Sequence, residues 1–391
     1  MEAPIPLEEV LKATGVQRQA VIGLPASHGM LDHRFPLTPE GAAMLVDRGF
    51  RVKMERGAAT LIHYPDDTYS RRGVEIVDRA EALAADIVVY LPALDSIDAR
   101  LLRRGSLLLT FLSPYADNPD VVRILLHRHV IALGLELLTD DAGRHPFADI
   151  LHEIDGRAAM AVASSLLADA VHGKGILLGG VAGVVPCEVC IIGADMAAIA
   201  AAQTAIGLGA TVKIFDNNVY NLRDTLRLLG PGVTGSTFHP RVFESALRTA
   251  DIVVATDTVP PVAVSADLAA VMKRGVICFD LTTTPGTVFP SLQVIDLDLA
   301  SPSDNDGGEP TRLCYINAGN TVPRTVAMAL SNTFVNMLDE VLVCDGVANA
   351  LKINSGLRAA AFTFLGKCVN RNVARALGIR AVDINLFLQF S

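Results

Sequence analysis

The sequence predicts an α/β protein of two domains, each built on a mostly parallel sheet, and three observations support this prediction. The chain has 391 residues, which is more than one hydrophobic core usually serves. Hydrophobic residues make up 51% of the chain, enough for sheets that are buried beneath helices. Strand-like apolar runs alternate with helical segments, and this alternation is typical of parallel strands joined by crossover helices.

The first part of the chain shows this alternation clearly. A short helix is expected at residues 7–14. A second helix opens at Thr38-Pro39-Glu40, where a capping Thr, a first-turn Pro and an acidic residue stand together, and Gly49 ends it. The strands expected here cover residues 19–24, 50–55, 86–91, 106–111 and 129–133.

The second part begins with a long Ala-rich helix, expected at residues 154–172, that carries the chain from one domain to the next. A strand at 188–192, a helix at 196–208 and a strand at 211–215 follow, and Asp216 ends the second strand. This βαβ unit of about 30 residues is the beginning of a doubly wound nucleotide-binding fold. Further strands are expected at 251–255, 276–280 and 293–296, a surface loop at 301–310, and helices at 325–343 and 357–377.

Charge and hydropathy argue against two classes of partner. The formal net charge is -9 and there is no basic cluster, so nucleic acid is not an expected partner. No apolar run has the length needed to cross a bilayer. The N-terminal segment carries Glu2, Glu8 and Glu9 and lacks the basic start of a signal peptide, so we expect a cytoplasmic protein.

The cysteines are expected to be buried, reduced thiols rather than metal ligands. Cys187 and Cys190 form a C-x-x-C pair, but Cys190 enters a run of β-branched residues that predicts a strand. A zinc or redox site would require a turn or a helix start there, with more ligands nearby, so we expect no metal. The six cysteines are Cys187, Cys190, Cys278, Cys314, Cys344 and Cys368.

Several short stretches, in order along the chain, match one known family. They are Arg34 to Gly41 (RFPLTPEG), Leu109 to Leu112 (LTFL), Glu153 with Gly156-Arg157, Gly179 to Pro186 (GGVAGVVP), Gly209 to Val212 (GATV) and Asn317 with Val322 to Thr325 (VPRT). On these stretches the chain, from about Ala20 to Gly378, resembles the family of alanine dehydrogenase and the alpha subunit of nicotinamide nucleotide transhydrogenase.

The resemblance implies an arrangement of domains and an activity. Residues 1–152 plus 320–391 would form the substrate-type domain, and 153–319 a Rossmann-type dinucleotide-binding domain inserted in it, with a cleft between the two. Enzymes of the family bind NAD(H) in that cleft, and alanine dehydrogenases interconvert alanine with pyruvate and ammonia. They are usually homohexamers, so we expect a homo-oligomer (a hexamer or a dimer) or assembly with a paralogue.

The family's catalytic set is an Arg, a Lys, a His and an Asp, which hold the substrate carboxylate, polarise the keto oxygen or imine and move protons. Arg34 stands at the family spacing for the carboxylate-binding Arg; the alternative is a structural Arg beside a helix start. Pro92 stands where the family has its Lys, Ser113 where it has its His and Thr284 where it has its Asp. The sequence therefore predicts a divergent member that lacks the usual catalytic residues.

The dinucleotide-binding turn is also altered. The fingerprint G-x-G-x-x-G/A corresponds here to Gly193, Asp195 and Ala198, so an acidic side chain replaces the second glycine, where the backbone should approach the pyrophosphate. Asp216 matches the family's ribose-binding acid, and without a neighbouring Arg it favours NAD over NADP. Asn317 is a further residue expected at the cofactor. NAD binding is therefore expected only if the site tolerates Asp195.

A different constellation in the expected cleft would have to replace the missing groups. The loop after the first strand brings His28, Asp32 and His33 close to Arg34, and Tyr90 and Asp95 follow a neighbouring strand. A new acid and base pair such as His33 with Asp32 is one interpretation, and solvated or capping residues are the other.

Three functional hypotheses follow. The first is an NAD-dependent amino-acid or keto-acid oxidoreductase with a non-standard site. The second is a catalytically silent relative, a pseudoenzyme kept as a structural or regulatory subunit, and the third is a cleft reused for a small anionic ligand held by Arg34. Because function depends on the site and not on the fold, the residues favour a silent or repurposed member over a true alanine dehydrogenase.

Overall fold

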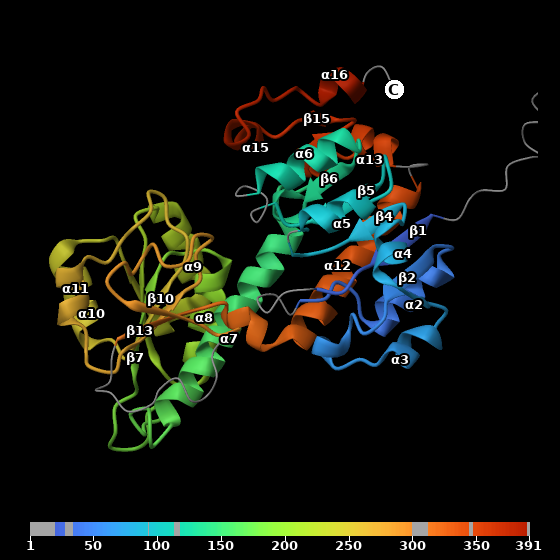
Figure 1. Ribbon diagram of the computed structural model, residues 1–391. Coiled ribbons are helices and arrows are strands. Elements are labelled where there is room, and N and C mark those ends of the chain that lie inside the picture. The colour runs from blue at the N-terminus through green and yellow to red at the C-terminus, as the bar shows by residue number, and fades with distance from the viewer. Residues whose placement is uncertain are drawn as a thin grey trace, which may run out of the picture.

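Two α/β lobes lie side by side, and one long helix, α7 (Pro146–Ala168), runs from one lobe into the other (Figure 1). The computed structural model describes residues 20–27, 34–92, 94–112, 118–298, 312–343 and 347–388. Each lobe has a mainly parallel sheet with helices on both faces, so the predicted α/β fold class is confirmed.

The sheet of the first lobe has eight strands among the described residues, in the order β15-β14-β6-β5-β4-β1-β2-β3. The strands from β3 to β6 are parallel and follow the 3-2-1-4-5-6 order of doubly wound folds, whereas β14 pairs antiparallel with β6. Two strands from the C-terminal part of the chain therefore complete the N-terminal sheet. The strands are β1 (Val21–Leu24), β2 (Arg51–Glu55), β3 (Glu75–Val77), β4 (Ile87–Val89), β5 (Leu107–Thr110), β6 (Ile131–Gly134), β14 (Ala361–Phe364) and β15 (Lys367–Cys368).

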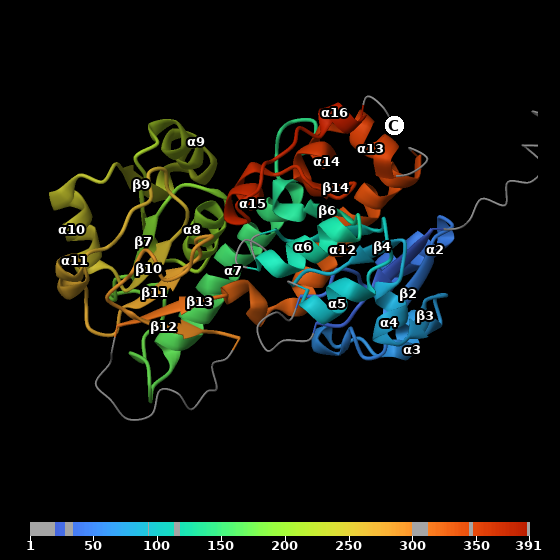
Figure 2. The ribbon, with the colours of Figure 1, turned by 45° about the horizontal axis from the view of Figure 1, so that its top comes forward.

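The sheet of the second lobe has seven parallel strands within the described ranges, in the order β12-β13-β11-β10-β7-β8-β9. Its central strands, β7, β10 and β11, are short and strongly apolar. Helices α10 and α11 cover one face of the sheet, and α8 and α9 cover the other (Figure 2). The order reverses between β7 and β10, as it does between β1 and β4 in the first lobe. The strands are β7 (Glu188–Ile192), β8 (Thr211–Phe215), β9 (Val233–Ser236), β10 (Ile252–Ala255), β11 (Ile277–Asp280), β12 (Gln293–Asp296) and β13 (Leu313–Ile316).

The helices divide between the lobes in the same way. Those of the first lobe are α2 (Pro39–Asp47), α3 (Asp66–Ser70), α4 (Arg79–Leu83), α5 (Ser96–Leu101), α6 (Pro119–His127), α12 (Pro323–Val343), α13 (Val347–Ile353), α14 (Ser355–Ala360), α15 (Arg371–Ala376) and α16 (Asn385–Leu388), with the 3-10 turns η1 (Thr60–Ile62) and η3 (Leu135–Leu137). Those of the second are α8 (Met196–Gly207), α9 (Val219–Leu229), α10 (Pro240–Thr249) and α11 (Ala266–Val271), with η4 (Gly230–Gly232). The 3-10 turn η5 (Ala318–Thr321) carries the chain back to the first lobe.

Helix α7 belongs to both cores. Phe147 and Ile154 pack in the core of the first lobe, while Ala159 and Leu167 pack in the core of the second. A Cβ on Gly156 would lie 2.2 Å from the carbonyl oxygen of Ala197, so the glycine allows α7 and α8 to approach closely. The Gly156-Arg157 stretch singled out in the sequence is therefore a packing requirement between the two helices.

Two helix predictions are wrong in their extent. The helix expected at 154–172 begins at Pro146, which occupies its first turn, and ends at Ala168. The helix expected at 357–377 ends at Ala360, because Phe362, Thr363 and Phe364 form strand β14 and Gly366 turns the chain with a φ of 77°. The strands β3, β9, β13 and β15 were not predicted, whereas the expected strands at 188–192, 211–215 and 293–296 have the predicted bounds. The segments 7–14 and 301–310 lie outside the described residues.

The buried character predicted for the cysteines is confirmed at the five described positions, Cys187, Cys190, Cys278, Cys314 and Cys368; Cys344 lies outside the described residues. Cys190 is part of strand β7, and burial raises the pKa of its thiol to about 12. Among the helices that the structure describes, none has both the length and the apolar composition of a membrane span.

Candidate functional site between the two lobes

The turn after β7 has the geometry expected of a dinucleotide-binding turn at its first glycine. Gly193 has a φ of 104°, which side chains rarely adopt, and a Cβ there would lie 2.1 Å from the hydroxyl oxygen of Thr256. Its N–H donates to the carbonyl of Phe215 (2.7 Å), so the turn is fixed to β8 as well. The predicted position of Gly193, at the point where the strand order reverses, is where ligands bind in doubly wound sheets.

Asp195 is the N-cap of α8. Its Oδ1 accepts a hydrogen bond from the N–H of Ala198 (2.9 Å), and the hydroxyl of Thr256 is a further partner of the same side chain. Burial raises the pKa of Asp195; the Ala198 N–H, His152 and Thr256 oppose this change, and Asp257 adds to it. The residue predicted to obstruct the turn by its charge therefore also satisfies a backbone donor of the helix.

Asp216 lies at the carboxyl end of β8, with 3% of its surface exposed. Its carboxylate accepts hydrogen bonds from the backbone N–H of Asn218 (2.6 Å) and of Ala194, and burial raises its pKa. In the described structure this carboxylate thus holds the turn after β7 against the loop after β8. The fully buried Ala198 packs in the core of the second lobe.

Asn317 lies directly before η5, where the chain returns from the second lobe to the first. Its φ is 60°, and its Nδ2 donates to Oδ1 of Asp296 (3.0 Å) at the end of β12. This contact gives the residue a structural function at the start of η5.

Arg34 faces the connecting helix from the first lobe. Its guanidinium lies over the ring of Phe111, 5.0 Å from the centroid, and its positive charge acts on the carboxylate of Asp155 in α7. The structure therefore places Arg34 between the end of β5 and α7, at the junction of the two lobes. A cation in this place is suited to hold a carboxylate.

Asp155 is a site residue that the sequence reasoning missed. Its Oδ1 accepts a hydrogen bond from the N–H of Gly319 in η5 (2.9 Å), and a Cβ on Gly319 would lie 2.2 Å from that oxygen. Burial raises the pKa of Asp155, while Arg34, the Gly319 N–H and His152 oppose the change. The Asp155 carboxylate thus links Arg34 of the first lobe, helix α7 and the 3-10 turn η5. The available signal in the sequence was the position of Asp155 beside Gly156-Arg157, one of the stretches that match the family.

His152 lies one helical turn before Asp155 and was also missed. It acts electrostatically on Asp155 and on Asp195, which belong to different helices, and its side chain is partly exposed. Arg34, His152 and Asp155 therefore stand on the side of the first lobe and α7, with Asp195 facing them from the second lobe. Together they bring a fixed cation, an imidazole and two carboxyl groups of raised pKa to one place.

Where the structure describes the other predicted residues, they make local contacts of their own. Pro92 follows β4, and its carbonyl accepts a hydrogen bond from the hydroxyl of Thr110 (3.3 Å). Thr284 is exposed, four residues beyond the end of β11, and its hydroxyl lies 3.3 Å from that of Thr287. Asp95 caps α5 through the N–H groups of Ile97 and Asp98 (both 2.8 Å), so it serves the helix rather than an acid and base pair. Ser113, His28, Asp32 and His33 lie outside the described residues.

A second cluster holds Ala26, two residues after the end of β1. The guanidinium of Arg79 pairs with Glu55 (2.9 Å) and Asp98 and donates to the carbonyl of Ala26 (2.9 Å). The N–H of Ala26 in turn donates to Glu55 (2.7 Å), and the ring of Tyr90 lies 5.8 Å from the guanidinium carbon. Burial alone would lower the pKa of Arg79, but Asp98, Tyr90 and Glu55 outweigh it and raise the pKa. These contacts hold Ala26 at the carboxyl edge of the first sheet.

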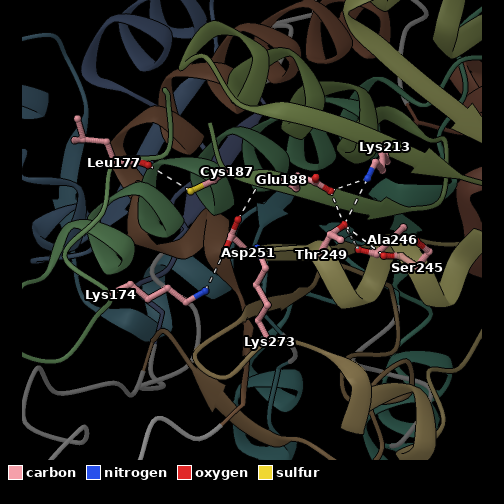
Figure 3. Close-up of polar contacts among 10 residues, drawn as sticks. All are labelled: Lys174, Leu177, Cys187, Glu188, Lys213, Ser245, Ala246, Thr249, Asp251 and Lys273. Atoms are coloured by element: carbon pink, nitrogen blue, oxygen red, sulfur yellow. Dashed lines mark hydrogen bonds and ion pairs between the residues drawn. The ribbon is translucent and has the colours of Figure 1, made fainter. Parts of the chain in front are cut away.

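A third polar cluster lies at the opposite edge of the second sheet (Figure 3). Asp251, just before β10, pairs with Lys273 (2.9 Å) and Lys174 (3.2 Å) and accepts from the N–H of Glu188 (3.2 Å). The Glu188 carboxylate pairs with Lys213 (2.6 Å). These groups stand at the amino ends of the strands, away from the junction of the lobes, and they stabilise the sheet edge.

Fold and site together define a two-lobed α/β protein with a dinucleotide-type turn on one lobe and an arginine on the other. The sequence patterns of the alanine dehydrogenase/PNT N-terminal and C-terminal domains match residues 23–152 and 159–371. The chain belongs to the alanine dehydrogenase/PNT family.

Individual relatives resemble the chain over nearly its whole length. It is 30% identical over 369 residues to the alanine dehydrogenase of Mycobacterium tuberculosis, covering 92% of this chain and 97% of that protein. It is 28% identical over 374 residues to the alanine dehydrogenase of Staphylococcus saprophyticus, covering 94% and 100%. Among solved structures, an L-alanine dehydrogenase matches with a TM-score of 0.80 at 24% identity, covering 92% of this chain and 99% of that one, which shows the shared fold.

Proposed function

We propose that this protein is an NAD(H)-dependent oxidoreductase that acts on a small substrate bearing a carboxylate, at a site that differs from the one known in its family. The observation that carries the proposal is the junction of the lobes, where Arg34 stands on one side and the turn of Gly193 and Asp195 on the other. Whole-length similarity to alanine dehydrogenases supports the reaction class.

The residues of the chain suggest a division of tasks. Arg34 would bind the substrate carboxylate, with Phe111 holding the guanidinium plane in place. Asp155 and His152 are the groups beside it that can hold or move a proton, and the raised pKa of Asp155 suits a carboxyl group for this task. Gly193 and Asp216 fit a dinucleotide, and Asp195 fits one only while its carboxyl carries a proton. A nicotinamide dinucleotide bound there supplies or accepts the hydride.

A second candidate function is a family member without dehydrogenase activity, silent or adapted to another small anion. The carboxylate of Asp195 on the first turn of α8 favours it, because this group takes a backbone donor that a phosphate would use. Pro92, Ser113 and Thr284, which stand where the resemblance places the family's Lys, His and Asp, favour it as well.

Two measurements on the purified chain distinguish the two candidate functions. Thermal unfolding is followed with NAD, NADH, NADP and NADPH, since a ligand at about 100 times its dissociation constant stabilises the folded state by about 2.7 kcal/mol. Turnover of alanine, pyruvate with ammonia, and other small amino and keto acids is then measured. The proposal predicts a shift with NAD or NADH and turnover of at least one substrate; no shift with any dinucleotide would overturn it.

Arg34→Ala tests the binding of the carboxylate, with Arg51→Ala as the matched control. Arg51 is an exposed arginine whose partner is Glu75, on the far strands of the first sheet. Loss of a charged hydrogen-bond pair should raise the KM for the acid substrate about 10- to 100-fold in Arg34→Ala. Arg51→Ala should leave the KM unchanged. Equal KM values in the two variants would show that Arg34 does not bind the substrate.

A further inference from the structure

The carboxylate of Asp195 stands where an anionic ligand of α8 would bind. Its Oδ1 accepts from the N–H of Ala198, and the carbonyl of Asp195 accepts from the N–H of Ile199 (3.0 Å). In doubly wound folds the first-turn N–H groups bind the diphosphate of a dinucleotide. The helix therefore already has an internal anion, and a diphosphate must compete with it for the same donor.

The groups that face Asp195 leave its charge poorly compensated. Thr256 and Asp257 approach from the end of β10 and His152 approaches from α7. On the opposite side of the turn, the N–H of Ala194 binds Asp216, and the carbonyl of Ala194 accepts from the hydroxyl of Thr225 in α9 (3.2 Å). Among the described residues, a further carboxylate, that of Asp257, acts on Asp195, and the Asp216 carboxylate lies on the other side of the turn. Adding a diphosphate beside an ionised Asp195 would cost about 1 kcal/mol or more for each close pair of like charges.

We propose that a dinucleotide enters this turn together with one proton, which neutralises the Asp195 carboxyl. The proton comes from the solvent, and no other covalent bond changes. The neutral carboxyl releases the Ala198 N–H to the diphosphate and can donate its own O–H to a phosphate oxygen. The inference rests on the proposed function, and it makes Asp195 a residue that sets cofactor affinity according to pH.

Calorimetric titration of the whole protein with NAD tests the proposal. Titrations run from about pH 6 to about pH 8.5, each in two buffers of different ionisation enthalpy, which gives the number of protons taken up. Because one proton binds with the ligand, the dissociation constant should rise by up to about tenfold per pH unit towards the alkaline end. Proton uptake should approach one per bound NAD in the same range.

Three variants locate the proton. Asp195→Asn keeps a capping side chain and removes the charge, so it should bind NAD equally well across the pH range with no proton uptake. His152→Gln removes a group that opposes protonation of Asp195, so the uptake should persist and extend to higher pH. Asp120→Asn, on the exposed start of α6, changes the net charge equally and should behave as the original chain.

The outcomes distinguish this inference from the proposed function. If the original chain binds NAD with a constant affinity and no proton uptake, the oxidoreductase proposal stands and the inference is wrong. If uptake persists in Asp195→Asn, or disappears in His152→Gln, another group takes the proton and the inference is wrong. If neither the original chain nor Asp195→Asn binds NAD at any pH, both proposals fail. If Asp195→Asn binds NAD and the original chain does not, the Asp195 charge blocks the site completely, which also overturns the inference.

Discussion

Asp155 shows how a single part-buried carboxyl group can make stability depend on pH. Its folded-state pKa is raised by burial, so its contribution to folding is fully present below the unfolded pKa and is lost as the pH rises through the folded pKa. Asp155→Asn should therefore reduce the loss of stability that sets in as the pH rises above about 4, the ordinary pKa of an aspartate. Asn can still accept from the N–H of Gly319, whereas Asp155→Ala leaves that donor unpaired and should cost about 1–3 kcal/mol at any pH.

Urea unfolding of the original chain and the two variants at a series of pH values measures these differences. Asp195 and Asp216 also have raised pKa values, so the pH dependence should become smaller in Asp155→Asn without disappearing. An unchanged dependence in that variant would show that Asp155 is neutral, or equally stable in both forms, over the range.

Local sequence patterns predicted some residues of the site and missed others. Gly193, Asp195 and Asp216 follow directly from the βαβ unit, because a strand end and a helix start fix their places in the fold. Asp155 and His152 could not be found in this way, since they lie within a long helix. Their importance depends on which lobe each helix face meets, and that is decided by contacts between segments far apart in the sequence, such as Asp155 with Gly319.

Among the elements, strand β10 depends on a charge cluster at its amino end. Asp251 is 11% exposed in its side chain and holds two lysines and one backbone N–H. Burial alone would raise its pKa, but Lys273, the N–H of Glu188 and Lys174 outweigh it and lower the pKa. Its stabilising effect is therefore present above the unfolded pKa of the aspartate and is lost as the pH falls through the folded pKa.

Asp251→Ala should cost about 3 kcal/mol at neutral pH, the lower end for breaking a buried pair, because Lys174 and Lys273 keep some contact with water. The cost should shrink as the pH falls from about 6 to about 3. Denaturant unfolding over that range measures it, with Asp224→Ala, an exposed aspartate of α9, as the control. A cost that is the same at every pH would mean that the side chain packs there without acting through its charge.

The elements also show where sequence patterns decide structure and where they do not. Helix α8 was predicted to within one residue at its end, because Asp195, an alanine-rich run and Gly209 mark it locally. The alanines of the region 357–377 predict a helix. The four-residue strand β14 forms there instead, because it pairs with β6 at the edge of the parallel strands. Edge pairing of this kind is a property of the assembled sheet, which a helical pattern in the sequence does not reveal.

At the scale of the whole molecule, an exposed apolar segment predicts self-association. Beyond the end of α7, residues 170–186 form a projection of the second lobe, on the side of α7 away from the first lobe (Figure 1). Its exposed apolar side chains are Val171, Ile176, Leu177, Val181, Val184 and Val185, and Val185 is 87% exposed. Such a concentration of apolar surface is typical of a protein interface.

We expect the purified chain to be a homo-oligomer that uses this projection. Light scattering after size exclusion should give a multiple of the chain mass, and the double variant Leu177→Glu with Val185→Glu should lower it. Val219→Glu, at an exposed valine on α9, is the control and should leave the mass unchanged. A monomeric original chain would contradict the expectation, and recovery of a larger complex only after mixing with a paralogue would point to assembly with that protein instead.

Because α7 contributes side chains to both cores, this one helix connects the two lobes rigidly. Bending that helix would pull Phe147 from one core or Leu167 from the other, and the return crossing lies against the same helix through Gly319 and Asp155. Rotation of the lobes about the long axis of α7 would have to twist the helix between Ile154, in the first core, and Ala159, in the second. We therefore expect the two lobes to keep a nearly fixed orientation. A ligand between Arg34 and Gly193 would then meet both sides of its site already in place.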